Sequence, residues 1–226
     1  IQKFLPESFV YFKPKDVISG DFYWLGEVDN KIIFGSFDCT GHGVPGAFMT
    51  LIGSDLMNLV TLVQKKTDPA EILTELHKQV VSQLRQDENK NQDGMDVAIC
   101  TIDKTNNTLE FAGAKNTLIA IKNGELEEYK GDKFPIGGTQ YQEDREFSKQ
   151  TFQLDGSCSF YMFSDGYIDQ FGGDEGRKFM RKQLKELCQT FASKPMPEQK
   201  EIIEQTMIDW MGNKSQIDDM LVIGFK

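Results

Sequence analysis

The chain has 226 residues, enough to bury a large apolar core in one large domain or two small ones. Its 35 acidic and 25 basic residues give a formal net charge of −10, and no basic run interrupts the acidic background. This balance argues against a nucleic-acid-binding surface, because such surfaces carry basic patches that contact phosphates. We favour a single domain over residues 1–226.

The four cysteines are far apart in the sequence, and none belongs to a C-x-x-C pair. A zinc site or a dense disulfide framework is therefore not indicated, and a reducing, cytoplasmic setting fits best. We find no apolar run near 18 residues and no basic-then-apolar N-terminus, so we expect neither a membrane span nor a secretory signal. The chain opens abruptly with IQKFLP, as if cut from a longer protein.

Three strands are predicted first. Residues Ser8 to Lys13 are aromatic and β-branched and lie between two prolines. Asp21 begins a second apolar run, Asp38 ends a third, and Asp29-Asn30 between them is a turn signal. Because the two strands of a hairpin run in opposite directions, Asp21 and Asp38 should be neighbours.

Two neighbouring carboxylates need a countercharge. At about 4 Å and an effective dielectric of about 20 they repel by roughly 4 kcal/mol. A shared proton, a Lys or Arg, or a divalent cation can offset this, and Mg²⁺ and Mn²⁺ take oxygen ligands. The glycine-dense turn CTGHGVPG follows Asp38 and leads into a helix, so backbone groups can approach a ligand and the helix N-terminus favours an anion.

Two helices are predicted after the hairpin. From Val44 to about Gln64 apolar residues recur at three- and four-residue spacing, which predicts a helix that covers one sheet. Its expected buried stripe is Val44, Phe48, Leu51, Ile52, Leu56, Leu59, Val60 and Val63. Asp68-Pro69 caps a second helix. His77 on that helix has no partner at ligand spacing, so we expect it at the surface or an edge.

After Gly94 the sequence changes to short strands separated by turn signals such as Asn106-Asn107 and Asn123-Gly124. The predicted strands are 96–102, 108–112, 117–121, 125–129, 147–154 and 158–163. We interpret the first four as a meander and the last two as joined across Asp155-Gly156. Together with two early helices, this number of strands predicts an α+β fold in which two packed antiparallel sheets are covered by helices.

Two further acidic sites stand next to strands in the last third of the chain. Strand 158–163 leads into Ser164-Asp165-Gly166, and the final strand, Met220 to Phe225, is preceded by Asp218-Asp219. Between them we expect a Gly-rich loop and two helices, the first from Lys178 to about Thr190.

Four motifs, S-G-D-F-Y, D-C-T-G-H-G-V-P, F-S-D-G-Y and D-D-M-L-V, occur in this order over nearly the whole chain. Together they resemble the PPM (protein phosphatase 2C-like) metal-dependent serine/threonine phosphatases, specifically the bacterial SpoIIE/RsbU branch. The resemblance implies an α-β-β-α sandwich with two Mn²⁺ or Mg²⁺ ions at one edge of the sheets. It also implies a mechanism without a side-chain nucleophile, in which a metal-activated water attacks the phosphorus in line.

Carried over residue by residue, the resemblance implies catalytic and metal-binding roles at the motif aspartates. The implied ligands are Asp21, Asp38 with the backbone carbonyl of Cys39, Asp165 and Asp218. Asp218 is favoured over Asp219 by the D-D-M pattern alone, because both faces of the final strand are apolar. Asp93 and Asp96 are candidates for a third metal position and stay outside the core set.

The sequence departs from the eukaryotic members at two places. Those members carry a His two residues after the second aspartate, whereas here Thr40 holds that place and His42 lies four residues after Asp38. They also use an Arg before the first aspartate to hold phosphate, whereas here Lys13 and Lys15 are the nearby basic residues. The roles of His42, Lys13 and Lys15 therefore stay open.

The resemblance implies a substrate with phosphoserine or phosphothreonine on a regulatory protein, such as an anti-sigma-factor antagonist, and a sensor domain upstream in the same chain. A homodimer stays open. The alternative function is a phosphatase-fold binding module that acts in partner switching with a metal site too weak for turnover. A two-metal nuclease is disfavoured by the acidic charge, and a nucleotide cyclase by the lack of a basic nucleotide loop.

Overall fold

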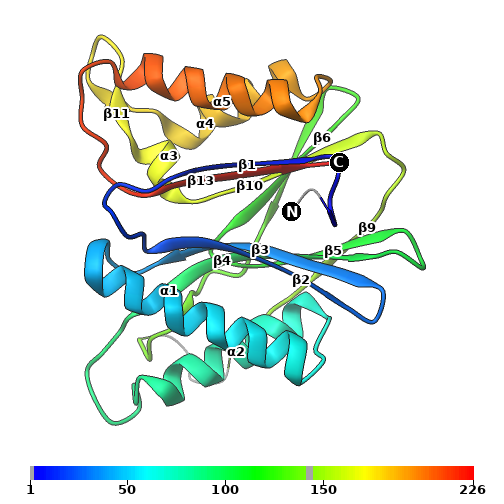
Figure 1. The fold of residues 1–226 in the computed structure, drawn as a ribbon, viewed down its shortest axis with the longest axis vertical. Coiled ribbons are helices and arrows are strands. Elements are labelled where there is room, and N and C mark those ends of the chain that lie inside the picture. Colours follow the sequence, from blue (N-terminus) through cyan, green and yellow to red (C-terminus); the bar gives the residue numbers. More distant parts are fainter. Residues whose placement is uncertain (1–2, 141–144) are drawn as a thin grey trace.

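The computed structural model describes residues 3–140 and 145–226 and has four layers in the order helix, sheet, sheet, helix (Figure 1). Sheet A has the strand order β1-β13-β10-β6-β7, and sheet B has the order β2-β3-β4-β5-β9, with β8 paired to β4. The strand pairs in both sheets are antiparallel. The predicted sandwich of two antiparallel sheets flanked by helices is therefore confirmed.

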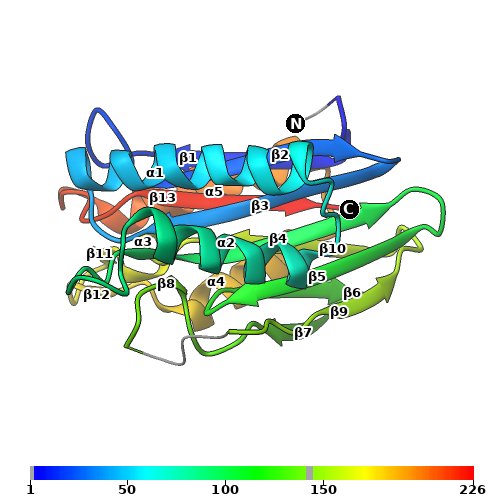
Figure 2. The same ribbon diagram turned by 90° about the horizontal axis from the view of Figure 1, so that it is seen from below.

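The elements divide between the two halves of the sandwich. Sheet A comprises β1 (Ser8–Lys13), β6 (Thr117–Lys122), β7 (Glu125–Lys130), β10 (Cys158–Phe163) and β13 (Met220–Phe225). Its outer face carries α3 (Asp165–Asp169), α4 (Met180–Phe191), α5 (Met196–Met211) and the short ribbon of β11 (Phe171–Gly172) and β12 (Arg177–Lys178). Sheet B comprises β2 (Asp21–Val28), β3 (Lys31–Cys39), β4 (Gly94–Asp103), β5 (Thr108–Ala114), β8 (Ile136–Gly137) and β9 (Gln150–Gln153). Its outer face carries α1 (Gly43–Met57), which continues as the π-helical segment η1 (Asn58–Val63), and α2 (Pro69–Gln83), as Figure 2 shows.

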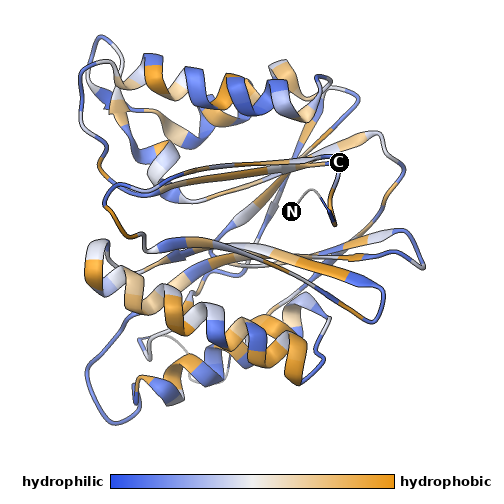
Figure 3. Cartoon of the chain, viewed as in Figure 1, coloured by the Kyte–Doolittle hydropathy of each residue, from blue (hydrophilic) through white to orange (hydrophobic). Residues whose placement is uncertain are grey.

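Apolar side chains form three buried layers, because successive residues of a strand point to opposite faces. Phe37 and Leu73 belong to the layer between sheet B and its helices, and Tyr161 to the layer between sheet A and its helices. Between the sheets, Phe34 and Phe225 meet edge to face with ring centroids 4.8 Å apart. Figure 3 shows the apolar positions along the strands and polar positions in the connecting loops.

The predicted meander is wrong in one respect, because its strands divide between the sheets. β4 pairs with β5 in sheet B, and β6 pairs with β7 in sheet A. The chain therefore crosses between the sheets at residues 115–116. Asp155-Gly156 also connects different sheets, since β9 pairs with β5 and β10 pairs with β6 and β13. Strand periodicity identifies strands but does not say which sheet takes them.

The helix after β3 covers sheet B as predicted, but through a different face. Of the predicted stripe, Leu56 and Val60 are buried, whereas Val44, Phe48, Leu51 and Val63 are 60%, 62%, 62% and 70% exposed. This helix is apolar around most of its circumference, so three-and-four spacing fits more than one stripe. The close approach to sheet B is made instead at Gly53, where an added Cβ would lie 2.8 Å from Phe22 Cζ.

The helical run Gly43–Val63, 21 residues long, is also long and apolar enough to cross a membrane by length and composition. It is the one such helix found within residues 3–140 and 145–226. The expectation that no apolar run approaches this length is therefore wrong. In this fold the run packs on sheet B through Met49, Leu56 and Val60.

His77 is buried, contrary to expectation. It is 1% exposed, and its Nδ1 accepts a hydrogen bond from the Gly137 N–H at 3.1 Å. The predicted cap of the same helix is confirmed, because Asp68 Oδ1 accepts hydrogen bonds from the N–H groups of Ala70 and Glu71. The histidine thus joins α2 to β8, in keeping with the rule that buried polar groups have hydrogen-bond partners.

Candidate metal centre

Three aspartates lie side by side across three strands at one edge of the sandwich. Asp21 of β2 is paired with Asp38 of β3, and Asp38 is paired with Asp96 of β4. Residues directly opposite in antiparallel strands project to the same face, with Cβ atoms about 5 Å apart. Phe34, on the same face of β3 as Asp38, packs between the sheets, so this row of acids faces sheet A. The predicted adjacency of Asp21 and Asp38 is confirmed.

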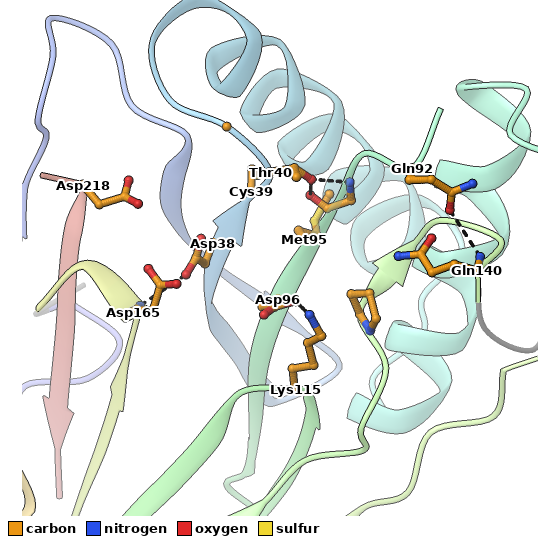
Figure 4. Close-up of a pocket in the computed structure, with 13 residues that line it drawn as sticks. Asp38, Cys39, Thr40, Gln92, Met95, Asp96, Lys115, Gln140, Asp165 and Asp218 are labelled. Atoms are coloured by element: carbon orange, nitrogen blue, oxygen red, sulfur yellow. Dashed lines mark hydrogen bonds and ion pairs between the residues drawn. The ribbon is translucent and has the colours of Figure 1, made fainter. Parts of the chain in front are cut away.

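Sheet A brings two more aspartates to the same edge. Asp165 follows β10 and begins α3, and its N–H donates to Asp38 Oδ2 at 3.2 Å. Asp218 precedes β13. Asp38, Asp96, Asp165 and Asp218 together line a cavity of about 280 Å³ (Figure 4). Asp21, beside Asp38 in the ladder, is 5% exposed and is not among the residues that line the cavity.

Glycines bring the loop after β3 close to the start of β2. A Cβ on Gly20 would lie 2.5 Å from the Gly41 carbonyl oxygen, and a Cβ on Gly46 would lie 2.4 Å from the same oxygen. Neither position therefore accepts a side chain without movement of the loop. This packing holds Cys39, whose carbonyl is an implied ligand, at the end of β3 beside Asp38. The Cys39 thiol is buried, and burial raises its pKa.

Burial raises the pKa of four of these carboxyls, Asp96 among them, and like charges add to the rise at the other three. Burial, followed by the charge of Asp38, raises the pKa of Asp21 to about 9. Burial, followed by the charge of Asp165, raises the pKa of Asp38 to about 8, and burial, followed by the charge of Asp218, raises the pKa of Asp165 to about 6. Asp21 Oδ2 is also buried without a hydrogen-bond partner. A buried, unpaired carboxylate oxygen is costly, and a bound cation would remove that cost.

The donors fit a hard divalent cation, because carboxylate oxygens and a backbone carbonyl are the ligands that Mg²⁺ and Mn²⁺ take. Within residues 3–140 and 145–226, no three His, Cys, Asp or Glu side chains converge closely enough to enclose an ion as they stand. The carboxylates instead lie around the cavity (Figure 4).

Asp218 and Asp219 have different surroundings. Asp219 is 2% exposed, and its two oxygens accept hydrogen bonds from the N–H groups of Lys15 and Gly20, each at 2.7 Å. Asp219 therefore fixes the loop that leads into β2. Asp218 is only partly buried and borders the cavity.

Several candidates from the sequence do not border the cavity. His42 Nδ1 lies 3.3 Å from Asp16 Oδ2, in an exposed pair. Lys13 and Lys15 are not among the lining residues. Asp93 is also absent from the lining, and its Oδ2 accepts a hydrogen bond from a neighbouring asparagine.

Sequence reasoning missed Lys115. Its Nζ lies 3.5 Å from Asp96 Oδ1, and both side chains line the cavity (Figure 4). The available signal was a single charged residue in the stretch AGAKNTLIAI, between two apolar strands.

Comparisons with known proteins identify the family. The family model described as Stage II sporulation protein E (SpoIIE) matches residues 29–226. The SiaA-PP2C domain of Pseudomonas aeruginosa is 32% identical, with 100% of this chain and 88% of that chain covered and a TM-score of 0.90. Comparison with curated proteins found no match.

Two further solved structures share the fold. The PP2C phosphatase domain of SpoIIE from Bacillus subtilis, with a fragment of its regulatory domain, is 15% identical, with 97% of this chain and 63% of that chain covered and a TM-score of 0.76. RsbX in complex with magnesium is 14% identical, with 96% of this chain and 92% of that chain covered and a TM-score of 0.63. The chain therefore belongs to the SpoIIE family of PP2C-type (PPM) serine/threonine phosphatases, and the resemblance drawn from the four motifs is confirmed.

Proposed function

We propose that this domain removes phosphate from phosphoserine or phosphothreonine on a regulatory protein, with a water activated by two divalent cations as the nucleophile. The observation that carries the proposal is the convergence of four aspartates from four segments of the chain at one edge of the sandwich: Asp38, Asp165 and Asp218 line the cavity, and Asp21 is paired with Asp38. A structural neighbour, RsbX, is known in complex with magnesium, and this supports the same class of ion here.

The residues that would hold two Mn²⁺ or Mg²⁺ ions are Asp21, Asp38, the Cys39 carbonyl, Asp165 and Asp218. When bound, the ions would lower the pKa of a water molecule and offset charge on the phosphoryl oxygens. Asp21 and Asp38 would release protons as the ions bind, because their pKa values of about 9 and about 8 lie above neutral pH. The Asp165 N–H orients the Asp38 carboxylate by its hydrogen bond to Oδ2.

The side chains at the cavity support water as the nucleophile. Cys39 is the cysteine among the described lining residues, and burial raises the pKa of its thiol, whereas a nucleophilic cysteine needs a lowered pKa. The hydroxyl of Thr40 donates to the Gly94 carbonyl at 2.8 Å and accepts from the Gly94 N–H at 2.6 Å. Thr40 is thus occupied in fixing its loop to β4.

The partners follow from the family. The solved SpoIIE fragment contains part of a regulatory domain next to its phosphatase domain. We extend this arrangement to the present protein: a sensor domain upstream in the same chain controls the phosphatase in the cytoplasm, and the substrate is a regulatory phosphoprotein of the anti-sigma-factor-antagonist type.

A rival function is a phosphatase-fold binding module that acts in partner switching without turnover.

Phosphate release from phosphoserine peptides separates the two functions. We expect release with Mn²⁺ or Mg²⁺, none after chelation, and none from Asp38→Asn, while the exposed loop variant Asp174→Asn keeps wild-type activity. A folded wild-type protein that binds a phosphoprotein but releases no phosphate at millimolar Mn²⁺ would favour the binding module. Release that continues under chelation would contradict the proposed mechanism.

A further inference from the structure

The cavity has one basic side chain among its described lining residues, Lys115. This lysine lies where the chain crosses from sheet B to sheet A, between β5 and β6. Its φ of +59° falls in the left-handed region, which costs a residue with a Cβ about 1 kcal/mol. Strained residues of this kind persist where the surrounding structure holds them, often at sites that position a side chain.

Backbone hydrogen bonds hold the crossing on both sides. The Lys115 N–H donates to the Asp132 carbonyl at 2.7 Å, and the Asn116 N–H donates to the Ala114 carbonyl at 2.7 Å. The Gly131 N–H donates to the Asn116 carbonyl at 3.1 Å. A Cβ on Gly131 would lie 2.5 Å from the Asn116 carbonyl oxygen, so the two segments are in direct contact. Hydrogen bonds and close backbone contact therefore hold the segment that carries Lys115.

The ammonium of Lys115 is available to an anion in the cavity. Its distance of 3.5 Å from Asp96 Oδ1 makes a loose ion pair, and the two side chains are 41% and 33% exposed. Exposed pairs of this kind contribute little stability. Asp38, Asp165 and Asp218 form the opposite side of the cavity, so the lysine faces the acidic cluster across it (Figure 4).

We propose that Lys115 binds the phosphate group of the substrate, in the role left open for Lys13 and Lys15, neither of which borders the cavity. This rests on the proposed function of the site. Two bound divalent cations would offset four of the five negative charges of the aspartates at the edge of the sandwich, so an incoming phosphate dianion would meet a site that is still negative without a further cation. Direct contact with the Lys115 ammonium, which has three N–H donors, offsets part of the phosphate charge at a point away from Asp38, Asp165 and Asp218. Without phosphate, the Lys115 ammonium pairs with Asp96. An incoming phosphate group takes the place of the Asp96 carboxylate at the ammonium.

Titration calorimetry of inorganic phosphate into the Mg²⁺-saturated protein tests this contact. The variants are Lys115→Met, Lys115→Arg and the control Lys122→Met, which removes a lysine that bonds Asp155 at 2.6 Å away from the cavity. Lys115→Met should weaken phosphate binding about tenfold or more and raise the KM for a phosphopeptide. Its Mg²⁺ affinity without phosphate should not fall. Lys115→Arg should restore most of the phosphate binding, and Lys122→Met should match wild type.

Unchanged phosphate affinity in folded Lys115→Met would overturn the proposal, as would a loss fully explained by weaker Mg²⁺ binding or a wild-type protein that binds no phosphate. If Lys115→Met does not fold, Lys115→Gly replaces it, because glycine accepts a φ of +59°. The phosphate-binding result can be distinguished from a test of the proposed phosphatase activity. A wild-type protein that binds phosphate through Lys115 but hydrolyses no phosphopeptide would refute the phosphatase activity and leave the phosphate contact standing.

Discussion

Replacement of Asp21 by Asn should stabilise the metal-free protein. Asp21 is 5% exposed, its Oδ2 is buried without a hydrogen-bond partner, and its pKa is raised to about 9 by burial and by the charge of Asp38. At pH 7 the folded chain therefore holds a proton on Asp21 that the unfolded chain has released. Asparagine has nearly the same shape as the protonated acid and needs no proton.

The magnitude follows from the pKa difference. The unfolded carboxyl has a pKa of about 3.9, which lies about 3 units below pH 7. Each unit corresponds to about 1.4 kcal/mol of free energy needed to keep the proton on Asp21 in the folded chain. The Asp21→Asn substitution should thus raise the free energy of unfolding by at most about 4 kcal/mol. For a chain of this length that is a rise in melting temperature of up to about 16 °C.

The sign of the pH dependence follows from the same difference. Because the folded pKa of about 9 lies above the unfolded value, the folded chain binds more protons than the unfolded chain between about pH 4 and pH 9. The free energy of unfolding of the chelated wild type should therefore fall as pH rises through this window. Asp21→Asn should flatten that fall.

Thermal melting in EDTA at several pH values measures both effects, with Asp68→Asn as the control. Asp68 pairs with Lys149 and its pKa is lowered, chiefly by that lysine against burial, so its replacement should destabilise slightly. In saturating Mn²⁺ the wild type should melt at a higher temperature than Asp21→Asn, because the wild type gains binding energy from the metal that Asp21→Asn cannot gain. A lower melting temperature for Asp21→Asn in EDTA at pH 7 would refute the electrostatic reasoning.

Two further pairs of variants test single features of the structure. Asp219→Asn should lower the free energy of unfolding by about 1–3 kcal/mol, because the amide nitrogen of asparagine cannot accept one of the two backbone hydrogen bonds. Asp218→Asn should keep the wild-type melting temperature but lose metal-dependent phosphate release. The reverse pattern would exchange the roles of the two aspartates. Met49→Ser should lower the free energy of unfolding by about 3 kcal/mol or more, whereas Phe48→Ser, at a 62% exposed position, should change it by less than about 0.5 kcal/mol. Equal losses for the two variants in urea unfolding would contradict the orientation of α1.

The parts of the site that depend on local sequence were predictable. Asp21 and Asp38 are paired because a two-residue turn, with positive φ at Asp29 and Asn30, fixes the register of the β2–β3 hairpin. The approach of Asp165 and Asp218 depends on the packing of one sheet on the other. No local pattern encodes that packing, and here only the order of the four motifs indicated it.

The missed features have physical reasons. Lys115 was missed because the strands around it were interpreted as one meander, in which a turn lysine points to solvent, whereas the chain changes sheets at this turn. The buried face of α1 was misjudged because its apolar residues surround the helix, so that close contact at Gly53 decides the orientation. His77 looked peripheral because its partner, the Gly137 N–H, lies 60 residues away in the sequence.

The central claim is that the aspartates at the edge of the sandwich hold two catalytic ions. Calorimetric titration of Mn²⁺ into the chelator-free protein at pH 7, repeated in buffers of different ionisation enthalpy, tests it most directly. We expect two ions per chain and a release of protons on binding, because Asp21 and Asp38 give up protons to bind the metal. Asp38→Asn should lose at least one ion. The absence of Mn²⁺ binding to folded wild-type protein, or binding unaffected by Asp38→Asn, would contradict the account.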